Sequence, residues 1–372
     1  MVGPLLEADG IEARVGDWCW AQTQPRPVPL EVVGFNGSRC LLMPLYNLMG
    51  MERGILVTDG IRPTFPDPAV LLGRVIDAAG KPLDGGPEIV ASEQGAPSPL
   101  LNPLERAVID EPFDVGVRCV NGLLTLGVGQ RVGLFAGSGV GKSVLLGMFA
   151  RYSAADVVVI GLIGERGREV QEFLTDNLGD SIAHSVVIAS PADDSAGMRL
   201  RAAMMAHEVA EHYRSKGRKV LLLLDSLTRI SQAQREIGLA AGEPPTSKGY
   251  PPSAFSMLPR LIERAGGLAD GNGSITAIYT VLMEEDDLSD PIVDAARAVL
   301  DGHIVLSRKI ADRGHYPAID VGASVSRVQR RLQSNEQQQA SSAFKRWWSR
   351  HSEQEDLIAV GAYEKGSDAD TD

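Results

Sequence analysis

A glycine-rich segment followed by lysine and serine is the strongest chemical signal in this chain. Residues 136–143 read Ala-Gly-Ser-Gly-Val-Gly-Lys-Ser, after an apolar run and before a segment of helical periodicity. Glycines let successive backbone N–H groups turn inward around a phosphate, and a helix start adds the positive end of its dipole. The pattern predicts a phosphate-binding P-loop. Its expected nucleotide-binding residues are Gly137, Ser138, Gly139, Val140, Gly141, Lys142, Ser143 and Val144.

The last two residues of the motif carry its ionic chemistry. Lys142 supplies a mobile ammonium for phosphate oxygens, and Ser143 offers a hydroxyl to Mg²⁺, so ATP and Mg²⁺ are the expected substrate and cofactor. Ala136 stands where the strict pattern has glycine, and alanine is small enough for a sharp turn at the strand end. The alternative is a glycine-rich loop that only caps a helix.

Two carboxylates follow other apolar runs and could complete such a site. The run 220–224 ends in Asp225, so a buried strand would deliver this carboxylate beside the P-loop to hold the water shell of Mg²⁺. Glu165 follows the run 156–163, where a carboxylate could orient a water for attack on a γ-phosphate. Alone, Asp225 could be a turn residue and Glu165 part of an exposed helix start.

The elements that must position these groups alternate along the chain. Between about residues 71 and 328, apolar strand runs alternate with helical periods, which is typical of an α/β fold with a mostly parallel sheet covered by helices. The clearest predicted strands are 131–135, 156–163, 185–189, 219–224 and 274–281, and the predicted helices are 142–153, 170–178 and 198–216.

Three parts are predicted along the chain. Residues 1–64 contain short strand-like runs, with an Asn36-Gly37 hairpin signal that calls for positive φ at both turn positions, so a small antiparallel β domain is expected. Three prolines within residues 62–68 indicate a linker, and residues 65–328 form the P-loop core. Residues 329–372 are rich in Gln, Ser, Glu and Asp and carry no apolar face wide enough for a core of their own, so this third part must pack on another surface or fray.

Composition excludes several classes of function. The 36 basic and 48 acidic residues give a net charge of −12, which disfavours general binding of nucleic acid or anionic lipid. The three cysteines, at positions 19, 40 and 119, form no close pair, so a reducing cytosol is expected rather than a disulfide framework or zinc knuckle. No run approaches the roughly 18 apolar residues of a membrane span, so a membrane would be reached only through partners.

Five segments together resemble the protein-export ATPases of bacterial flagella, which are relatives of type III secretion ATPases and of rotary ATP synthase catalytic subunits. They are GLFAGSGVGKSVLLG (133–147), VIGLIGERGREVQEF (159–173), LLLLDSLTRI (221–230), AQREIGLAAGEPPTSKGYPPSAF (233–255) and LDGHIVLSRKIADRGHYPAIDVGASVSRV (300–328). Residues 32–45, VVGFNGSRCLLMPL, also resemble the β-barrel domain of that family. The resemblance therefore implies an incomplete β-barrel-like domain over residues 1–64 and a short, partial helical domain over residues 329–372. The resemblance implies a RecA-like ATP-hydrolysing motor that engages export substrates and chaperones.

The resemblance also implies roles for residues around the phosphates. Lys142 and Ser143 would hold phosphates and Mg²⁺, and Glu165 would be the catalytic carboxylate. The remaining implied roles are phosphate contact for Arg166, ordering of the water shell of the metal for Glu169 and Asp225, and a place close to the site for Arg229.

Two further residues are implied to contact the nucleotide. Tyr316, in HYPAID, resembles a tyrosine that stacks on adenine, although a core tyrosine would look alike in sequence. Arg327, in SVSRV, resembles an arginine finger presented to the nucleotide of a neighbouring subunit, whereas alone it would be an ordinary surface charge. Because Glu165 and Arg327 lie on one chain, a homohexameric ring of this chain could be self-sufficient.

The expected setting follows from the same resemblance. We expect a cytoplasmic protein, peripheral at the cytoplasmic face of the inner membrane, with export-apparatus regulator and stalk proteins among its partners and no nucleic acid. The alternatives are a virulence type III secretion ATPase and a rotary ATP synthase or V-type catalytic subunit. A ring helicase or termination factor is disfavoured by the net charge of −12, and a non-catalytic subunit by the presence of Lys142 and Glu165. The chain is expected to be shorter than its relatives at both ends.

Overall fold

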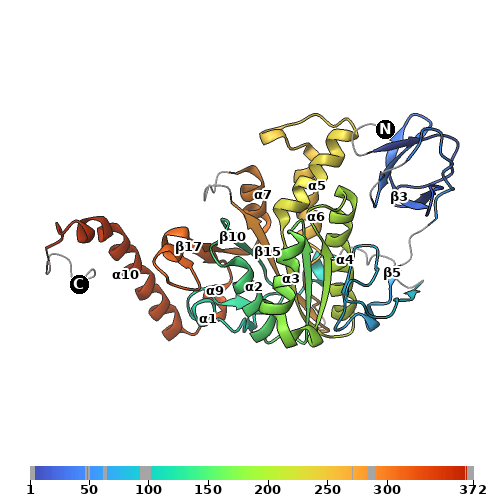
Figure 1. Ribbon diagram of the computed structural model, residues 1–372. Helices are drawn as coiled ribbons and strands as arrows, with labels where there is room; N and C mark the ends of the chain where they lie inside the picture. The colour runs from blue at the N-terminus through green and yellow to red at the C-terminus, as the bar shows by residue number, and fades with distance from the viewer. Residues whose placement is uncertain are drawn as a thin grey trace.

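A nine-stranded sheet forms the centre of the computed structural model (Figure 1). The structure describes residues 5–46, 48, 51–61, 65–92, 102–269, 271–283, 290–364 and 366. The strands of the sheet follow the order β17-β16-β10-β15-β13-β11-β12-β6, and β14 pairs with β15 outside that path. In chain order they are β6 (Val75–Ile76), β10 (Arg131–Ala136), β11 (Val157–Ile163), β12 (Ser185–Ser190), β13 (Lys219–Asp225), β14 (Gly266–Gly267), β15 (Ser274–Leu282), β16 (Gly302–Leu306) and β17 (Ile319–Ser326).

The direction of the strands decides which strand ends lie at the same edge of the sheet. From β16 to β6 all neighbours on the path run parallel, whereas β17 is antiparallel to β16. The carboxyl ends of β10, β15, β13 and β11 therefore lie side by side at one edge, where ligands bind in open parallel sheets. The five predicted strands are confirmed to within one residue at each end.

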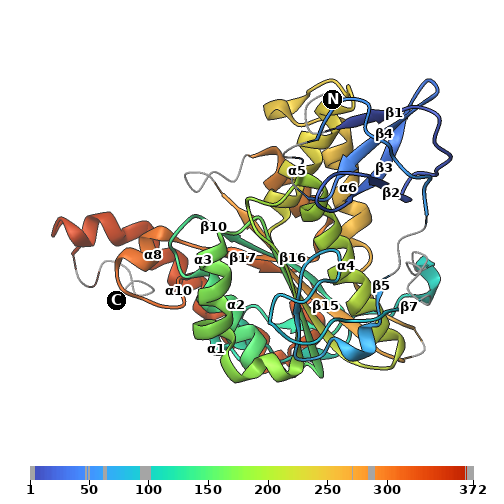
Figure 2. The same cartoon turned by 45° about the vertical axis from the view of Figure 1, so that its right-hand side comes forward.

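Helices cover both faces of the sheet (Figure 2). One hydrophobic cluster packs α4 (Ala196–Ser215), α5 (Leu227–Ala240), α6 (Pro252–Ile262) and α7 (Pro291–Val299) on one face. A second cluster packs α2 (Lys142–Tyr152) and the segment from α3 (Gly167–Glu172) through a π-helical turn (Phe173–Leu178) on the other. Every residue of β11 is buried and its successive side chains alternate between the two clusters, as a strand covered on both faces requires.

A second, antiparallel sheet lies at the N-terminal end. It contains β1 (Leu6–Ala8), β2 (Trp18–Ala21), β3 (Val28–Asn36) and β4 (Arg39–Pro44) in the order β1-β4-β3-β2, with bridges from Val57 and Ile61 to β2. The predicted hairpin between β3 and β4 forms, but Asn36 pairs with Arg39, so the two turn residues are Gly37 and Ser38. Only Gly37 has positive φ (61°), so the expectation of positive φ at Asn36 was wrong.

The N-terminal sheet is attached to the core through α4. The guanidinium carbon of Arg201 lies 4.4 Å from the ring centroid of Trp18, a cation–π contact. The Ser195 hydroxyl, which caps α4, donates to the carbonyl of Leu45 over 2.9 Å. Part of the predicted linker, residues 62–64, lies outside the described residues, and the boundary at residue 65 stays a prediction.

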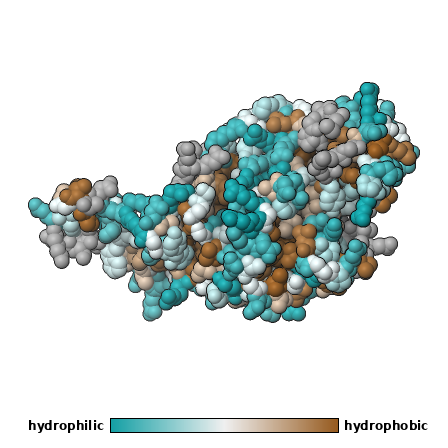
Figure 3. All heavy atoms as spheres, viewed as in Figure 1, coloured by the Kyte–Doolittle hydropathy of each residue, from teal (hydrophilic) through white to brown (hydrophobic). Residues whose placement is uncertain are grey.

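The C-terminal residues form α9 (Gln329–Leu332) and the long helix α10 (Asn335–Ala359), which extends from the core (Figure 1). Polar contacts attach this region, because the buried Gln333 side chain donates to the carbonyl of Gly122 over 3.1 Å and to the Thr125 hydroxyl over 2.9 Å. Hydrophobic side chains gather at the far end of α10 (Figure 3), where Leu357 and Ile358 are exposed. The predicted helical segment is thus confirmed.

The remaining elements are short. They are β5 (Phe65–Pro66), β7 (Ala91–Ser92), β8 (Pro112–Phe113), α1 (Arg118–Leu123), β9 (Leu126–Gly127) and α8 (Arg308–Asp312). None of the helices in the described ranges has the length and apolar character needed to cross a membrane.

His207 on α4 is fully buried against β15. Its Nδ1 lies 2.8 Å from the carbonyl of Ala203 and its Nε2 lies 3.0 Å from the Tyr279 hydroxyl. A neutral imidazole satisfies both contacts, with Nδ1–H donating to the carbonyl and Nε2 accepting from the hydroxyl. Burial, together with the nearby charges of Arg264 and Arg214, lowers the pKa of His207 to about 3.

We expect His207→Gln to flatten the pH dependence of folding stability. An unfolded histidine titrates near pH ~6.5, so below that pH the unfolded chain binds a proton that the folded chain excludes. The free energy of unfolding of the parent chain therefore falls as the pH decreases from about 6.5, by up to about 1.4 kcal/mol per pH unit from this group. Urea unfolding at several pH values measures this slope. The exposed His351 provides the control variant His351→Gln, and parallel curves for parent and His207→Gln would contradict the assignment.

Candidate active site

The predicted P-loop joins the end of β10 to the start of α2. Gly139 and Gly141 have φ of 75° and 90°, in the left-handed region that favours glycine. Within the described part of the chain, the backbone N–H groups of Gly139, Gly141 and Lys142 donate to no other protein atom. Ser143 and Val144 at the helix start are exposed. The loop therefore presents free N–H donors and a helix start to solvent, an arrangement that binds phosphate.

Lys142 is held between two carboxylates. Its Nζ lies 2.5 Å and 2.7 Å from the two oxygens of Asp225 and 3.0 Å from Oε1 of Glu165. Their side chains are only 11%, 4% and 15% exposed. Burial alone would lower the pKa of Lys142, but the charges of Asp225 and Glu165 outweigh it and raise that pKa above its usual value. The structure thus brings together three residues predicted from three separate segments.

Asp225 has a further partner that sequence reasoning missed. The buried hydroxyl of Thr280, on β15, donates to Oδ1 of Asp225 over 2.6 Å. Thr280 lies inside a predicted strand, but a single threonine in an apolar run carries no local signal of this contact. Only the strand order, which places β15 beside β13, reveals it.

The backbone around Glu165 is fixed by a tight turn. Gly164 has φ of 72° and its N–H donates to the carbonyl of Ser190 over 2.8 Å, while the carbonyl of Glu165 accepts from Ala192 N–H over 2.9 Å. A Cβ atom on Gly164 would lie 2.8 Å from Cβ and Cγ of Arg229. Arg229 therefore packs against the residue before Glu165, and its guanidinium donates to Gln232 over 3.0 Å.

Arg166 and Glu169 lie apart from the lysine cluster. Arg166 is 82% exposed at the start of α3, and its Nη1 lies 3.3 Å from Oε1 of Glu169. In the described structure neither forms an ion pair with Lys142, Glu165 or Asp225. Their implied contacts with phosphate and with the water shell of the metal stay predictions.

The segment around α8 contacts the P-loop at two points, Ser138 and Gly141. Tyr316 is 61% exposed, and a Cβ atom on Gly141 would lie 3.7 Å from its ring carbons. Arg308, the first residue of α8, donates from Nη2 to the carbonyl of Ser138 over 2.9 Å. Tyr316 thus offers an open aromatic face beside the loop. Arg308 was not singled out from sequence, although it lies inside a segment that carries the family resemblance.

Arg327 lies at the opposite edge of the sheet from the P-loop. Because β17 is antiparallel to β16, Ser326 pairs with Gly302 at the start of β16. The Arg327 N–H donates to the carbonyl of Asp301, whose carboxylate accepts from Arg131 at the start of β10. The P-loop begins six residues after Arg131, which at about 3.3 Å per strand residue is roughly 20 Å away. The exposed Arg327 side chain therefore lies far from the phosphate site of its own chain.

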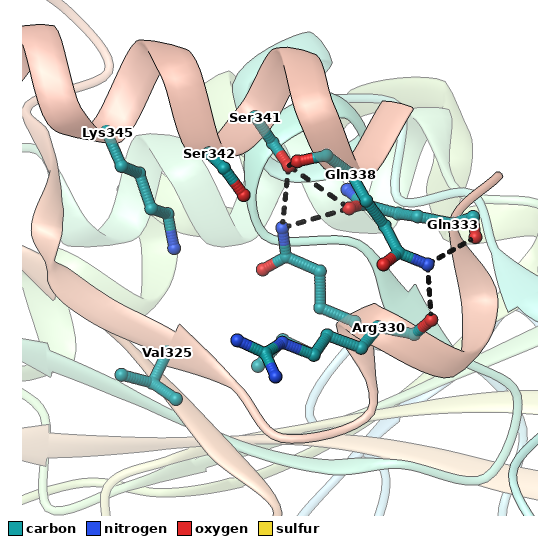
Figure 4. A pocket seen from close by; sticks show the side chains of 9 residues that line it. Val325, Arg330, Gln333, Gln338, Ser341, Ser342 and Lys345 are labelled. Carbon is teal, nitrogen blue, oxygen red and sulfur yellow. Dashed lines mark hydrogen bonds between the residues drawn. The ribbon is translucent and has the colours of Figure 1, made fainter. Parts of the chain in front are cut away.

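A polar pocket of about 220 Å³ adjoins the strand end that carries Arg327 (Figure 4). The side chains of Gln329, Gln333 and Ser341 hydrogen-bond to one another on its wall. Arg330 and Lys345 project into it from α9 and α10. These contacts connect α9, which begins two residues after Arg327, to α10.

The site fits a magnesium nucleotide better than a metal bound by protein alone. Among the described residues there is no group of three or more His, Cys, Asp or Glu side chains that could hold a metal ion. Mg²⁺ in nucleotide sites is held through one or two carboxylates, retained waters and the phosphates themselves. Asp225 and the exposed Ser143 supply such a partial set beside the P-loop. Fold and site together define a P-loop nucleotide-hydrolysing protein.

Comparison with known proteins specifies the family. Residues 116–326 match the ATP synthase alpha/beta family, nucleotide-binding domain, and residues 333–372 match the T3SS EscN ATPase C-terminal domain. The chain is 54% identical to a flagellum-specific ATP synthase of Pseudomonas aeruginosa, over 100% of this chain and 84% of that protein. It is 48% identical to a type 3 secretion system ATPase of Xanthomonas euvesicatoria, over 100% of this chain and 85% of that protein.

Solved structures give the same result. The assembled ATPase EscN of the enteropathogenic E. coli type III secretion system superposes with a TM-score of 0.91 at 42% identity, over 100% of this chain and 90% of that chain. EscN in complex with its central stalk EscO gives 0.88 at 41% identity, with the same coverage. The chain belongs to the ATP synthase alpha/beta family, in the group of flagellar and type III secretion ATPases. The predicted fold class and family are confirmed, and the chain is an ATPase.

We expect Gly164→Ala to impair hydrolysis and stability together. Alanine at this position would have to adopt the left-handed backbone conformation of Gly164, and its methyl would lie 2.8 Å from the Arg229 side chain. The turn must therefore shift and carry Glu165 with it. A loss of roughly 2 kcal/mol in stability is expected from strain of this kind. Gly167→Ala is the matched control, since nothing lies within 4 Å of its added methyl. Thermal unfolding and ATPase rates measure both effects, and equal behaviour of the two variants would contradict the expectation.

Proposed function

We propose that this chain is the ATP-hydrolysing motor of a bacterial flagellar type III protein-export apparatus. The observation that carries the proposal is Lys142 held between Asp225 and Glu165 beside an open P-loop, in a chain 54% identical to a flagellum-specific ATP synthase. Flagellum-specific ATP synthases of Pseudomonas aeruginosa and Salmonella typhimurium are both 54% identical to this chain, against 48% for the type 3 secretion system ATPase of Xanthomonas euvesicatoria, which supports the flagellar assignment.

The nucleotide would be held by backbone donors and one aromatic ring. The free N–H groups of Gly139 and Gly141 and the ammonium of Lys142 bind the phosphates, and Lys142 exchanges a carboxylate oxygen for a phosphate oxygen when ATP arrives. Tyr316 stacks on the adenine, because its ring is exposed next to Gly141. Ser143 and Asp225 would hold Mg²⁺, which supplies charge neutralisation at the phosphates when bound. Glu169 contributes to the water shell of the metal once its side chain turns away from Arg166, its present partner in a surface ion pair of 3.3 Å.

Hydrolysis is an in-line displacement at the γ-phosphorus. Glu165 accepts a hydrogen bond from a water and takes its proton as the bond from the water oxygen to phosphorus forms. The bond from phosphorus to the bridging oxygen breaks at the same centre, and ADP leaves. Lys142 stabilises the negative charge on the transferred group. Arg229 serves this step by packing against Gly164 and so fixing the position of Glu165.

The finger arginine must come from another copy of the chain. Arg327 lies roughly 20 Å from its own P-loop along β10, so it can serve only the site of a neighbour. A head-to-tail ring, with a hexamer as the expected size, satisfies this requirement for every subunit. The structures of assembled EscN and of EscN with its stalk EscO support a ring of this chain and a stalk partner.

The wider assignment extends the same proposal. Residues 1–64, 65–328 and 329–372 form the N-terminal, ATPase and C-terminal units. A regulator protein, export substrates and chaperones are further partners, and the protein works in the cytoplasm at the face of the inner membrane. Binding of nucleic acid is not part of the function, in line with the net charge of −12.

We expect Glu165→Gln to keep nucleotide binding and lose turnover. The amide retains the size of the side chain but cannot accept the proton, so the hydrolysis rate should fall by roughly 10³-fold. Fluorescence titration with a labelled ATP analogue and a phosphate-release assay measure the two properties. Glu172→Gln removes an exposed carboxylate that pairs with Arg168 on the same segment, and it should leave both unchanged. Normal turnover by Glu165→Gln would exclude Glu165 as the base.

We expect a mixture of two inactive variants to regain activity. Glu165→Gln retains its finger, and Arg327→Ala retains its base but should lose roughly 10³-fold in rate while still binding ATP. In random mixed rings roughly a quarter of the interfaces would combine an intact Glu165 with an intact Arg327. The ATPase rate of the equimolar mixture, compared with each variant alone, tests this. A finger acting within its own chain would give no recovery.

A further inference from the structure

The buried hydroxyl of Thr280 has one acceptor at short hydrogen-bond distance. It lies on β15, between the P-loop strand β10 and the Asp225 strand β13, and is fully buried. Its Oγ1 lies 2.6 Å from Oδ1 of Asp225, whereas the carbonyl of Leu224 is 3.5 Å away. The shorter contact has the length of a hydroxyl donating to a charged carboxylate, and the longer one is too long to compete.

This hydroxyl has a specific task because Asp225 has few other donors. In the described structure, the carboxylate oxygens of Asp225 accept hydrogen bonds only from Thr280 and from Lys142. Rotation of a carboxylate about its terminal bond is otherwise soft. Once Lys142 turns to a phosphate, Thr280 is the remaining donor that holds the carboxylate plane.

The strand that carries Thr280 is itself anchored on both sides. Leu282 N–H donates to the Thr228 hydroxyl on α5 over 2.9 Å. Met283 N–H donates to the carbonyl of Ala136, the residue before the P-loop glycines, over 3.0 Å. The hydroxyl of Thr280 is thus fixed relative to both the P-loop and Asp225.

We propose that Thr280 is a positioning residue that orients Asp225 toward the hydrated Mg²⁺ of the bound nucleotide. Oδ1 is occupied by the threonine hydroxyl, which leaves Oδ2 for the water shell of the metal. This assignment rests on the proposed ATPase site and adds to it a hydroxyl from a strand that supplies no other group to the reaction. A merely structural hydroxyl would affect folding stability alone.

The experiment separates these roles with three variants. Thr280→Val keeps the shape and removes the hydroxyl, and Thr280→Ser keeps the hydroxyl. Thr276→Val is the control for a buried threonine of the same strand, because its hydroxyl accepts from Gly129 N–H at the other end of β15. Affinity for a fluorescent ATP analogue is measured with Mg²⁺ and with a chelator, and kcat, KM and unfolding midpoints are measured alongside.

We expect Thr280→Val to bind the metal-free analogue with the same affinity as the parent. The factor by which Mg²⁺ increases the affinity should be about tenfold smaller in the variant, the value of one charge-assisted hydrogen bond. Its kcat should fall by at least the same factor, and Thr280→Ser should recover both. Thr276→Val should change the unfolding midpoint but not the effect of Mg²⁺. If Thr280→Val fails to fold, Thr280→Ala carries the same expectation.

An unchanged effect of Mg²⁺ and a normal kcat in Thr280→Val, or equal losses in Thr276→Val, would overturn the positioning role. Failure of the proposed ATPase site gives a different result. In that case the parent chain itself shows no turnover or no dependence of affinity on Mg²⁺, whatever residue occupies position 280.

Discussion

The buried ammonium of Lys142 is the constraint on which the active-site edge of the sheet depends. A charge removed from water must be paired, and an unpaired one costs several kcal/mol. Lys142 meets this requirement with two carboxylates from β13 and from the turn after β11. Both strands must therefore end level with the P-loop, and parallel pairing through β15 provides that alignment. The same pairing places the lysine where a phosphate can replace one of its partners.

How much of this architecture was predictable depends on how local each signal is. The P-loop, the five strands and the carboxylates at their ends were predicted because apolar runs and glycine spacing are visible over short windows. Thr280 and Arg308 were not, since their contacts depend on strand order and on a chain separation that no window contains. Likewise α5, α6 and α7 were not predicted as helices, and α10 was predicted only as part of a C-terminal helical segment without bounds. Tyr316 and Arg327 came only from family resemblance.

The short helix α8 connects regions that are distant in sequence. Arg308 at its start contacts the P-loop, and Tyr316 just beyond it lies against Gly141. On its other side Lys309 lies 2.6 Å from Glu355 of α10, which also pairs with Arg313. The pKa of Glu355 is lowered, chiefly by the hydrogen bond from Lys309. One turn of helix thus contacts both the phosphate loop and the C-terminal helix, so the two regions cannot shift independently without breaking charged contacts.

Because β17 runs antiparallel to β16, strand β10 separates the P-loop from the strand end that carries Arg327. Its six residues separate the P-loop at one end from the Arg131–Asp301 contact that holds the backbone of Arg327 at the other. In a ring built as proposed, each subunit binds a nucleotide at its own P-loop and supplies Arg327 to the nucleotide site of its neighbour. The length of β10 sets the spacing between these two sites. One inserted residue would change that spacing by about 3.3 Å, more than any hydrogen bond tolerates. In the proposed ring, the length of β10 therefore sets the distance between consecutive nucleotide sites.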